Sequence, residues 1–355
     1  MSTYIIAEAG VNHNGNIDIA MKLIEEASQA GADAIKFQTF KAENVVTHGA
    51  KKASYQVKNT SSSGSQYRML KKLELPFESH YKLMDYCSEK NIDFLSTAFD
   101  LESLEFLYKN LNLQTLKIPS GELTNAPLLL EFGRSGRNLI LSTGMANLDE
   151  IDAALNVIAF GLTGNGIPSS ALMKNNYKSR KTKDLLKEKV TLLHCTTEYP
   201  APLNEINLRA IKTLKNTFDL NIGYSDHSEG IQVSISATVL GASVIEKHFT
   251  LDKTSEGPDH KASLEPSELK EMVKGIRNVD EYLGDGIKEP TESEMKNIEI
   301  ARRSIVANEK ISKGTRFSAE NLTTKRPATG KSPMDYWNLI GKKSRKDYEK
   351  DEIID

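Results

Sequence analysis

The chain has 355 residues, of which 39% are hydrophobic and 26% charged, as is typical of a globular protein with one large domain and one small one. A formal net charge of −2 excludes the overall basic field of a nucleic-acid-binding protein. The sequence has no signal-peptide pattern, no apolar run near the ~20 residues that span a membrane, and only two cysteines, so we expect a cytoplasmic protein without disulfides.

Eight short apolar runs alternate with segments of helical periodicity. The runs are continuously apolar, which is typical of parallel strands that are covered on both faces. The predicted strands are 4–8, 33–38, 92–97, 115–120, 138–143, 190–196, 221–226 and 243–248. The predicted helices are 18–30, 78–90, 101–109, 126–133, 149–160, 204–217, 230–240 and 267–283. Eight strand–helix units predict an α/β fold, a (β/α)8 TIM barrel over residues 1–283.

Four segments do not belong to these units. Residues 41–75 are polar and predict a long loop, and residues 161–189 predict a basic surface excursion between the fifth and sixth units. Residues 284–300 begin with Gly and Pro and predict a linker. Residues 301–355 contain short strand-like runs with turn signals, which indicates a small, mostly β domain.

Polar and charged residues stand at the carboxyl ends of the predicted strands. In a TIM barrel these ends form the active site, whereas buried charges without a function are costly unless they are paired. The residues are Glu8, Lys36, Gln38, Ser96, Thr97, Lys117, Ser120, Ser142, Thr143, His194, Ser225, Asp226, His227, Glu246 and His248. The sequence therefore predicts a catalytic site at this end of the barrel.

His227 and His248 end two consecutive strands, and adjacent strands lie ~4.8 Å apart. Both imidazoles can therefore reach one divalent ion of the Mn²⁺, Fe²⁺, Zn²⁺ or Co²⁺ type. The alternative is a pair of hydrogen-bonded histidines near the rim. His13 either serves the same site or shapes a Gly/Asn turn, and we expect His48 and His80 to be solvated.

Lys36 and Lys117, together with the nearby Ser and Thr hydroxyls, supply the donors that a phosphate group requires. A lysine that forms a Schiff base is the competing function. The hydroxyls also suit helix capping, which phosphate binding does not exclude.

Seven motifs spread along the chain are "IIAEAGVNHNG", "AIKFQTFKAE", "KIPSGE", "LSTGM", "YSDHS", "EKHFTLDK" and "GPDHKASLEP". In these motifs the chain resembles the bacterial sialic acid (N-acetylneuraminate) synthase family, which includes the legionaminate synthases. Its last 55 residues, with "TKRPATG", resemble the SAF or antifreeze-like domain. The resemblance covers almost the whole chain.

The resemblance implies that phosphoenolpyruvate condenses with the open-chain aldehyde of N-acetylmannosamine and with water, giving N-acetylneuraminate and phosphate by C–O cleavage. The alternative within the family is N,N'-diacetyllegionaminate synthesis from 2,4-diacetamido-2,4,6-trideoxymannose. The resemblance also implies a divalent metal, preferably Mn²⁺ but also Mg²⁺ or Co²⁺, held by His227 and His248. The metal would polarise the aldehyde as a Lewis acid.

Site roles carried over by motif fall into three groups. Phosphoenolpyruvate would bind Lys36, Thr97, Lys117, Ser120, Ser142, Ser225 and Thr197, the last of which replaces an Asn found in some members. The sugar would bind Gln38, Tyr199, Asp259 and Arg326, and the catalytic group would contain Glu8, Glu122 and Glu246. Arg326 would act from the partner subunit of a homodimer whose SAF domains are swapped.

Three other functions stay open. A synthase of phosphorylated keto sugars needs an arginine cluster for its acceptor, and no arginine cluster stands at a predicted strand end. A Schiff-base aldolase would use Lys36 or Lys117 and no metal. A non-catalytic carbohydrate-binding protein is suggested by the C-terminal domain alone. We expect small-molecule substrates, with neither nucleic acid nor membrane as a partner.

Overall fold

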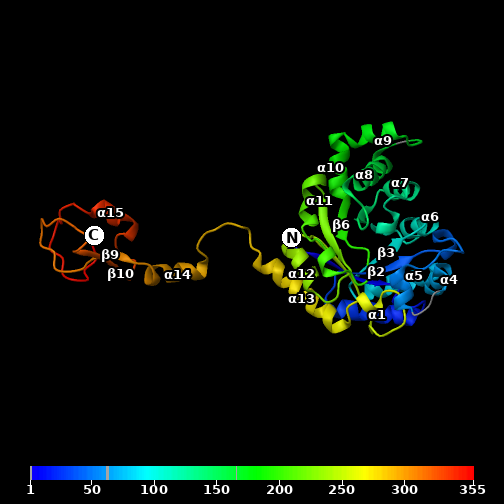
Figure 1. The fold of residues 1–355 in the computed structure, drawn as a ribbon, viewed down its shortest axis with the longest axis horizontal. Helices are drawn as coiled ribbons and strands as arrows, with labels where there is room; N and C mark the ends of the chain where they lie inside the picture. The colour runs from blue at the N-terminus through cyan, green and yellow to red at the C-terminus, as the bar shows by residue number, and fades with distance from the viewer. Residues whose placement is uncertain (1, 61–63, 165) are drawn as a thin grey trace. The chain divides into compact units, whose positions relative to one another are not determined.

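The computed structural model describes residues 2–60, 64–164 and 166–355, and its first part is a closed barrel of eight parallel strands (Figure 1). The strands pair in chain order, and β8 closes the barrel against β1. Their bounds are β1 Tyr4–Gly10, β2 Ala34–Thr39, β3 Asp93–Ala98, β4 Thr115–Ile118, β5 Asn138–Ser142, β6 Val190–Cys195, β7 Asn221–Asp226 and β8 Val244–His248. The predicted TIM barrel is confirmed.

A helix follows each strand and covers the outside of the barrel. The eight are α1 Ile17–Ala30, α5 Phe77–Glu89, α6 Leu101–Glu105, α7 Ala126–Arg134, α8 Leu148–Thr163, α11 Ala210–Phe218, α12 Gln232–Val239 and α13 Pro266–Tyr282. Local chemistry sets their ends: the Asn16 side chain accepts hydrogen bonds from the first turn of α1, and Gly31, with φ of 83°, ends it in the left-handed region. α6 continues as a π-helical turn, Phe106–Asn110.

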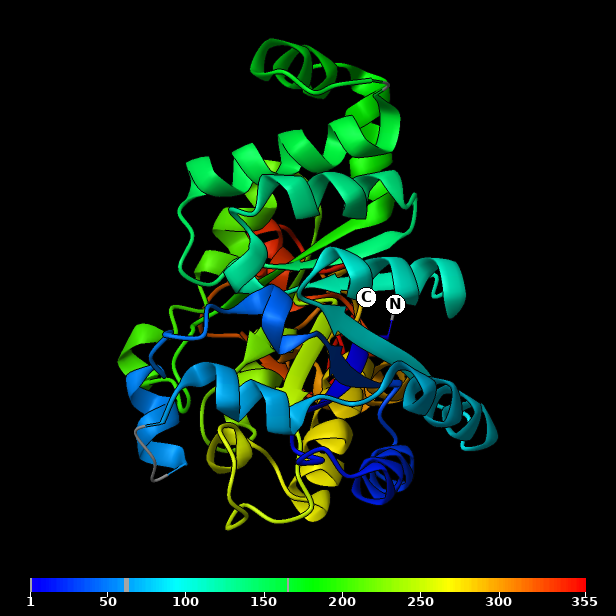
Figure 2. The same cartoon turned by 90° about the vertical axis from the view of Figure 1, so that its right-hand side faces the viewer.

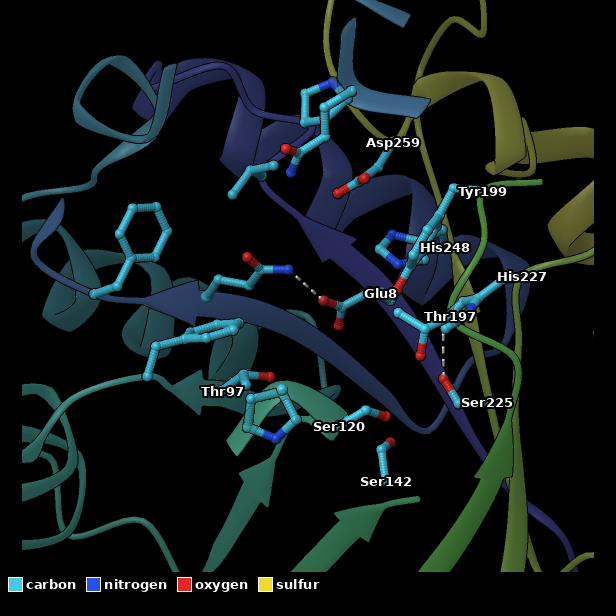
Figure 3. A pocket seen from close by; sticks show the side chains of 18 of the residues that line it. Glu8, Thr97, Ser120, Ser142, Thr197, Tyr199, Ser225, His227, His248 and Asp259 are labelled. Atoms are coloured by element: carbon cyan, nitrogen blue, oxygen red, sulfur yellow. Dashed lines mark hydrogen bonds between the residues drawn. The ribbon is translucent and has the colours of Figure 1, made fainter. Parts of the chain in front are cut away.

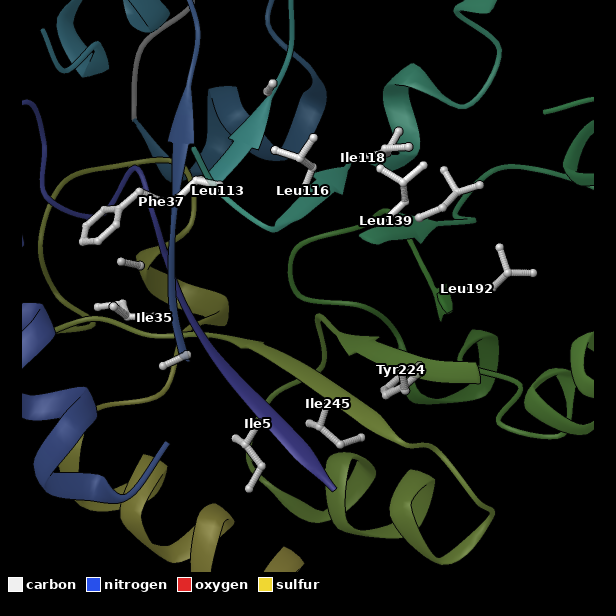
Figure 4. Close-up of a cluster of buried hydrophobic side chains, with 14 of the residues drawn as sticks. Ile5, Ile35, Phe37, Leu113, Leu116, Ile118, Leu139, Leu192, Tyr224 and Ile245 are labelled. Atoms are coloured by element: carbon white, nitrogen blue, oxygen red, sulfur yellow. The ribbon is translucent and has the colours of Figure 1, made fainter. Parts of the chain in front are cut away.

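Side chains alternate between the two faces of every strand, so the barrel has two separate apolar regions. Outward-facing residues pack under the helices, as Figure 4 shows for Ile5, Ile35, Leu116 and Ile245. A smaller cluster has the opposite parity and fills the interior with Ile6, Ala34, Leu95, Ile140, Leu193 and Val244. This interior layer supports the polar residues that follow it toward the carboxyl ends of the strands.

The prediction of a loop over residues 41–75 is wrong. The segment contains α2 Ala42–Val45, α3 Ser54–Asn59 and α4 Gln66–Leu73. α4 buries Met69 and Leu73 while its lysines stay exposed, so an amphipathic pattern was present in a segment that looked uniformly polar. Asn59 Nδ2 donates to the Pro258 carbonyl at 2.7 Å, which ties the segment to the loop that follows β8.

The excursion at 161–189 is also helical, with α9 Ser170–Tyr177 and α10 Arg180–Lys189. In Figure 2 the green helices α8–α10 lie together on one side of the barrel. α7 and α8 approach closely because Gly133 and Gly161 face each other, and a Cβ on Gly133 would lie 2.4 Å from the Ile158 carbonyl oxygen. The excursion helices α9 and α10 contact α8, so they extend the helical layer outward from α8.

The chain divides into two compact units, Met1–Gly284 and Asp285–Asp355. The segment predicted as a linker contains α14 Glu292–Ala301, which begins with a capping box from Thr291 and Glu294. The second unit adds β9 Ser304–Ala307, which pairs antiparallel with β10 Leu322–Lys325, and α15 Tyr336–Leu339. Its own core includes Ile305, Ile311, Phe317, Leu322 and Tyr348. No helix in the described part of the chain is long and apolar enough to cross a membrane.

Candidate active site

A pocket of about 330 Å³ opens at the carboxyl ends of the barrel strands. Most of the residues singled out from the sequence line it: Glu8, Lys36, Gln38, Thr97, Lys117, Ser120, Ser142, Thr197, Tyr199, Ser225, His227, Glu246, His248 and Asp259. Figure 3 shows Tyr199, His227 and His248 gathered on one side of Glu8, and Ser120 and Ser142 on the side of β4 and β5. Residues from eight strands or their loops therefore converge on one cavity.

Several polar residues at strand ends point away from this pocket, because neighbouring positions on a strand face opposite sides. Ser96 Oγ bonds Thr39 Oγ1 at 2.6 Å, and Thr143 Oγ1 donates to the Leu193 carbonyl. His194 Nε2 lies 2.7 Å from the Ile206 carbonyl oxygen, and Asp226 is bonded to Ser228 and Ser234. These groups serve the layer between strands and helices.

Two lysines and two glutamates form the charged centre of the pocket. Strand register brings them together: Glu8 lies opposite both Lys36 and His248, and Ser225 lies opposite Glu246. Lys36 Nζ contacts Glu8 Oε2 and lies 3.7 Å from Glu246 Oε2, while Lys117 Nζ lies 3.6 Å from Glu246 Oε1. All four side chains are at least nine-tenths buried.

The two carboxyl groups of this centre differ in proton affinity. Burial raises the pKa of Glu8 to about 7, despite the opposing charge of Lys36. Burial also disfavours ionisation of Glu246, but the ammonium groups of Lys117 and Lys36 outweigh it and lower the pKa of Glu246 to about 2. At neutral pH Glu8 can therefore gain or lose a proton while Glu246 stays charged.

Hydroxyl groups surround the lysines on the side of β3–β5. Lys36 Nζ donates to Thr97 Oγ1 at 2.8 Å, and Lys117 Nζ donates to Ser142 Oγ at 2.7 Å. Ser120 Oγ accepts the Gly144 N–H at 3.0 Å. A Cβ at Gly144 would lie 2.3 Å from Thr197 Oγ1, so glycine keeps this part of the pocket open. The arrangement suits a phosphate or carboxylate group.

The histidine pair is buried and neutral. Burial lowers the pKa of His227 to about 4 and holds the pKa of His248 well below its usual range. The two rings have centroids 5.6 Å apart, and Tyr199 stacks on His227 with centroids 4.2 Å apart. His227 Nδ1–H donates to the Thr196 carbonyl at 2.6 Å, which leaves Nε2 as an acceptor, 3.3 Å from Ser225 Oγ.

These histidines fit a divalent metal. Nδ1 of His248 is buried and has no hydrogen-bond partner among the described residues, and a backbone bond orients His227, as is usual for a ligand histidine. Within residues 2–60, 64–164 and 166–355, no group of three or more His, Cys, Asp or Glu is arranged to hold an ion. The protein would thus supply two imidazole ligands to such an ion, and substrate or water would complete the coordination.

Asp259 and Gln38 line the pocket above the charged centre. Burial raises the pKa of Asp259 to about 7. Burial, and after it the charge of Asp259, raises the pKa of Tyr55, whose ring lies 5.0 Å from that of Tyr199. Gln38 Nε2 lies 3.4 Å from Glu8 Oε1. Amide, phenol and carboxyl groups of this kind can bind the hydroxyl and amide groups of a sugar.

Three further residues of the first unit that were singled out from the sequence do not line the cavity. Glu122 lies in the short 3-10 turn Ser120–Glu122 and accepts a hydrogen bond from Asn125 Nδ2 at 2.6 Å. His13 accepts the Gly15 N–H on Nδ1 and shapes the turn after β1. His80 was expected in solvent, but it is fully buried, because Thr39 and Pro76 occupy its two ring nitrogens. Arg326 is exposed on the second unit.

One wall of the pocket was not predicted from the sequence. Its residues come from the helices of 41–75 and from the loops after β1–β3: Val11, Phe40, Val45, Tyr55, Gln56, Gln66, Met69, Leu70, Leu73 and Phe99. The spacing of Met69, Leu70 and Leu73 in "RMLKKL" was a helical signal.

Comparisons with known proteins agree with this architecture. Residues 23–288 match the model of the NeuB family, and residues 302–355 match that of the SAF domain. The N,N'-diacetyllegionaminic acid synthase of Campylobacter jejuni is 53% identical over 99% of this chain and 98% of its own length. The enzyme of the same name from Legionella pneumophila is 43% identical over 96% of this chain and 90% of its own length.

A solved structure gives the same result. The N-acetylneuraminic acid synthetase of Leptospira borgpetersenii superimposes with a TM-score of 0.68 and is 33% identical over 84% of this chain and 91% of its own. A family model that spans three quarters of the chain, relatives that align over nearly all of it and a barrel with the same fold lead to one conclusion. The chain belongs to the NeuB family.

Proposed function

We propose that this enzyme condenses phosphoenolpyruvate with 2,4-diacetamido-2,4,6-trideoxymannose and water to give N,N'-diacetyllegionaminate and phosphate. The observation that carries the reaction class is the convergence of two buried lysines, two carboxyl groups and a neutral histidine pair in one pocket. The choice of acceptor rests on sequence identity. The two legionaminic acid synthases are 53% and 43% identical to this chain, whereas the N-acetylneuraminic acid synthetase is 33% identical. N-acetylmannosamine, the acceptor preferred from the sequence, becomes the second candidate.

Phosphoenolpyruvate is an anion with a phosphate and a carboxylate, and one side of the pocket matches it. Lys36 and Lys117 offer ammonium groups, and Thr97, Ser120, Ser142, Thr197 and Ser225 offer hydroxyls. Charge-assisted hydrogen bonds in a buried cavity are the strong kind. A proton on Glu8 leaves the four-residue centre with a net positive charge, which favours the anion.

The acceptor aldehyde belongs beside the histidine pair. His227 and His248 would hold a divalent metal, for which we propose Mn²⁺, and when bound it would polarise the aldehyde as a Lewis acid. Tyr199 packs on both imidazoles and borders the space for the sugar. Gln38 and Asp259 would orient the acetamido and hydroxyl groups.

The chemistry then runs between the two bound substrates. C3 of phosphoenolpyruvate attacks the aldehyde carbon, and a water molecule adds to C2. Glu8 gives its proton to the new alkoxide and then takes one proton from that water, a role that suits a carboxyl group with a pKa of about 7. The second proton goes from the C2 hydroxyl to the phosphate, which leaves as the C2–O bond breaks and the keto group forms.

We further propose a homodimer in which each small unit supplies Arg326 to the sugar site of its partner. Arg326 is exposed on the second unit, within the segment that matches the SAF domain. An exposed guanidinium near a sugar site would bind an amide carbonyl. The role follows from the resemblance of "TKRPATG" to the family motif.

Phosphate release tests the proposed function. The assay offers phosphoenolpyruvate with either 2,4-diacetamido-2,4,6-trideoxymannose or N-acetylmannosamine, with Mn²⁺ or with EDTA. We expect metal-dependent release with the diacetamido sugar. Faster release with N-acetylmannosamine would assign the second candidate. Release that EDTA leaves unchanged, together with a borohydride-trapped adduct on Lys36 or Lys117, would favour the Schiff-base mechanism.

A further inference from the structure

The pocket has an apolar wall that neither the phosphate chemistry nor the histidine pair uses. We define the apolar wall as Val11, Phe40, Val45, Met69, Leu70, Leu73 and Phe99, all of which line the cavity. These residues form their own hydrophobic cluster, separate from the barrel core and from the interior layer. Four of them are less than a tenth exposed.

The apolar wall lies across the pocket mouth from His227. Phe40 and Phe99 immediately follow β2 and β3, beyond Lys36, Gln38 and Thr97 on the same strands. In the closed order of strands β3 is diametrically opposite β7, which His227 follows. An acceptor whose aldehyde carbon lies beside the histidines and above phosphoenolpyruvate therefore extends its other end toward the apolar wall.

The apolar wall is held in place by hydrogen bonds at its base. The Ala42 N–H at the start of α2 donates to Glu74 Oε1 at 2.6 Å, which joins α2 to the end of α4. The Phe40 and Phe99 rings pack edge to face with centroids 6.0 Å apart. Because the segment is also tied to Pro258 through Asn59, a polar substituent cannot easily push the wall aside to reach water.

We propose that the apolar wall binds the C6 methyl group of the acceptor and selects 6-deoxy sugars over sugars with a C6 hydroxyl. This inference rests on the proposed function, in which the apolar wall would determine the choice of acceptor sugar. A methyl group gains apolar contact at the wall, whereas a hydroxyl there loses its hydrogen bonds to water. A rigid apolar pocket distinguishes two substrates that differ by one such hydroxyl by roughly 10- to 100-fold in kcat/KM.

The test isolates C6 with a pair of sugars that differ only there. Phosphate release is measured with N-acetylmannosamine and with 2-acetamido-2,6-dideoxymannose, and the diacetamido sugar is measured in parallel. We expect kcat/KM to be roughly 10- to 100-fold higher for the 6-deoxy member of the pair. Equal values for the pair would overturn the proposal.

Two variants place a hydroxyl on the wall with little change in shape. Val45→Thr and Phe99→Tyr should each lower the 6-deoxy preference at least threefold, because the new hydroxyl can bond the C6 hydroxyl and removes apolar contact. Val239→Thr, at an exposed position at the end of α12, is the matched control and should keep the wild-type ratio. Thermal unfolding of each variant shows whether it is folded.

The outcomes separate this inference from the proposed function. If the enzyme prefers the diacetamido sugar but does not distinguish the C6 pair, the 4-acetamido group carries the selection and the role of the apolar wall is refuted. If it prefers N-acetylmannosamine over both 6-deoxy sugars, the proposed function and the inference both fail. A C6 preference that folded Val45→Thr and Phe99→Tyr both retain in full would assign the preference to another part of the pocket and overturn the assignment to the wall.

Discussion

Lys247 Nζ lies 3.2 Å from Asp226 Oδ2, and neither side chain has any exposed surface. Asp226 also accepts hydrogen bonds from Ser228 N–H at 2.8 Å and from Ser234 Oγ at 2.7 Å, and Lys247 donates to the Ser228 carbonyl. Since His227 stands between Asp226 and Ser228, this network fixes the loop that carries it. Lys247 precedes His248, so the same pair anchors both histidines from behind the pocket.

Removing one member of this pair should destabilise the fold strongly. Lys247→Met leaves the Asp226 carboxylate buried without its counter-charge, and we expect a loss of about 3–5 kcal/mol in the free energy of unfolding. Urea denaturation measures it. Lys187→Met is the matched control, because its partner Asp219 is largely exposed and ion pairs in water contribute little to stability. Equal midpoints for Lys247→Met and wild type would contradict a structural role for the pair.

Metal binding should depend on both histidines. We expect one divalent ion per chain after loading with Mn²⁺ and desalting, measured by elemental analysis, and EDTA should abolish phosphate release reversibly. His227→Ala and His248→Ala each remove one of the two proposed protein ligands, so retained metal should fall to background. His48→Ala, at an exposed loop position, is the control and should retain the ion. Full retention in both pocket variants would place the metal elsewhere.

His80 should make stability depend on pH. Burial lowers the pKa of His80 in the folded chain, whereas the unfolded chain titrates near ~6.5. A lowered folded pKa stabilises the fold above ~6.5, and this stabilisation is lost as the pH falls, because the unfolded state then binds the proton more readily. The penalty of His80→Gln in urea denaturation should therefore shrink from pH 8 to pH 5. A penalty for His80→Gln that is constant with pH would refute the assignment.

The sequence predicted the barrel well because each strand is a continuous apolar run and each helix has its own periodicity. The sequence predicted that polar residues stand at the carboxyl ends of the strands, but not which side of the strand each one faces. Ser96 and Thr97 are neighbours, yet only Thr97 reaches the pocket. Strands buried on both sides lack the alternation of polar and apolar residues that would reveal the face. The helix α4 was not predicted because its charged residues conceal a two-turn apolar stripe. The apolar wall, to which α4 contributes, was therefore not predicted either.

The prediction that His80 is solvated was wrong for a different reason. Its burial depends on Thr39, which lies 41 positions away in the sequence and bonds its Nε2 at 2.9 Å. A pairing over that separation forms only when β2 and α5 pack together. The position of His80 near the start of a predicted helix does not indicate whether its side chain is buried. Without knowledge of the neighbouring strand, the segment "FESHYKL" is typical of a surface helix.

The proposed exchange of small units makes a prediction that single variants cannot test. Lys117→Met should inactivate the barrel site by removing a buried ammonium group from the anion site, and Arg326→Ala should weaken the sugar site from the second unit. In a swapped dimer that carries one copy of each variant, one of the two sites has both an intact barrel and an intact Arg326. In an unswapped dimer neither site does.

Co-expression of the two variants with different affinity tags, followed by purification through both tags, yields the mixed dimer. We expect about half of the wild-type kcat from it at saturating sugar, since one of two sites is complete. Each variant dimer purified alone is the control and should stay far below this level. A mixed dimer no more active than the mean of the two controls would show that Arg326 serves its own chain or no sugar site at all. Recovery would require that the site is built from two chains, because no single chain in the mixture contains both intact residues.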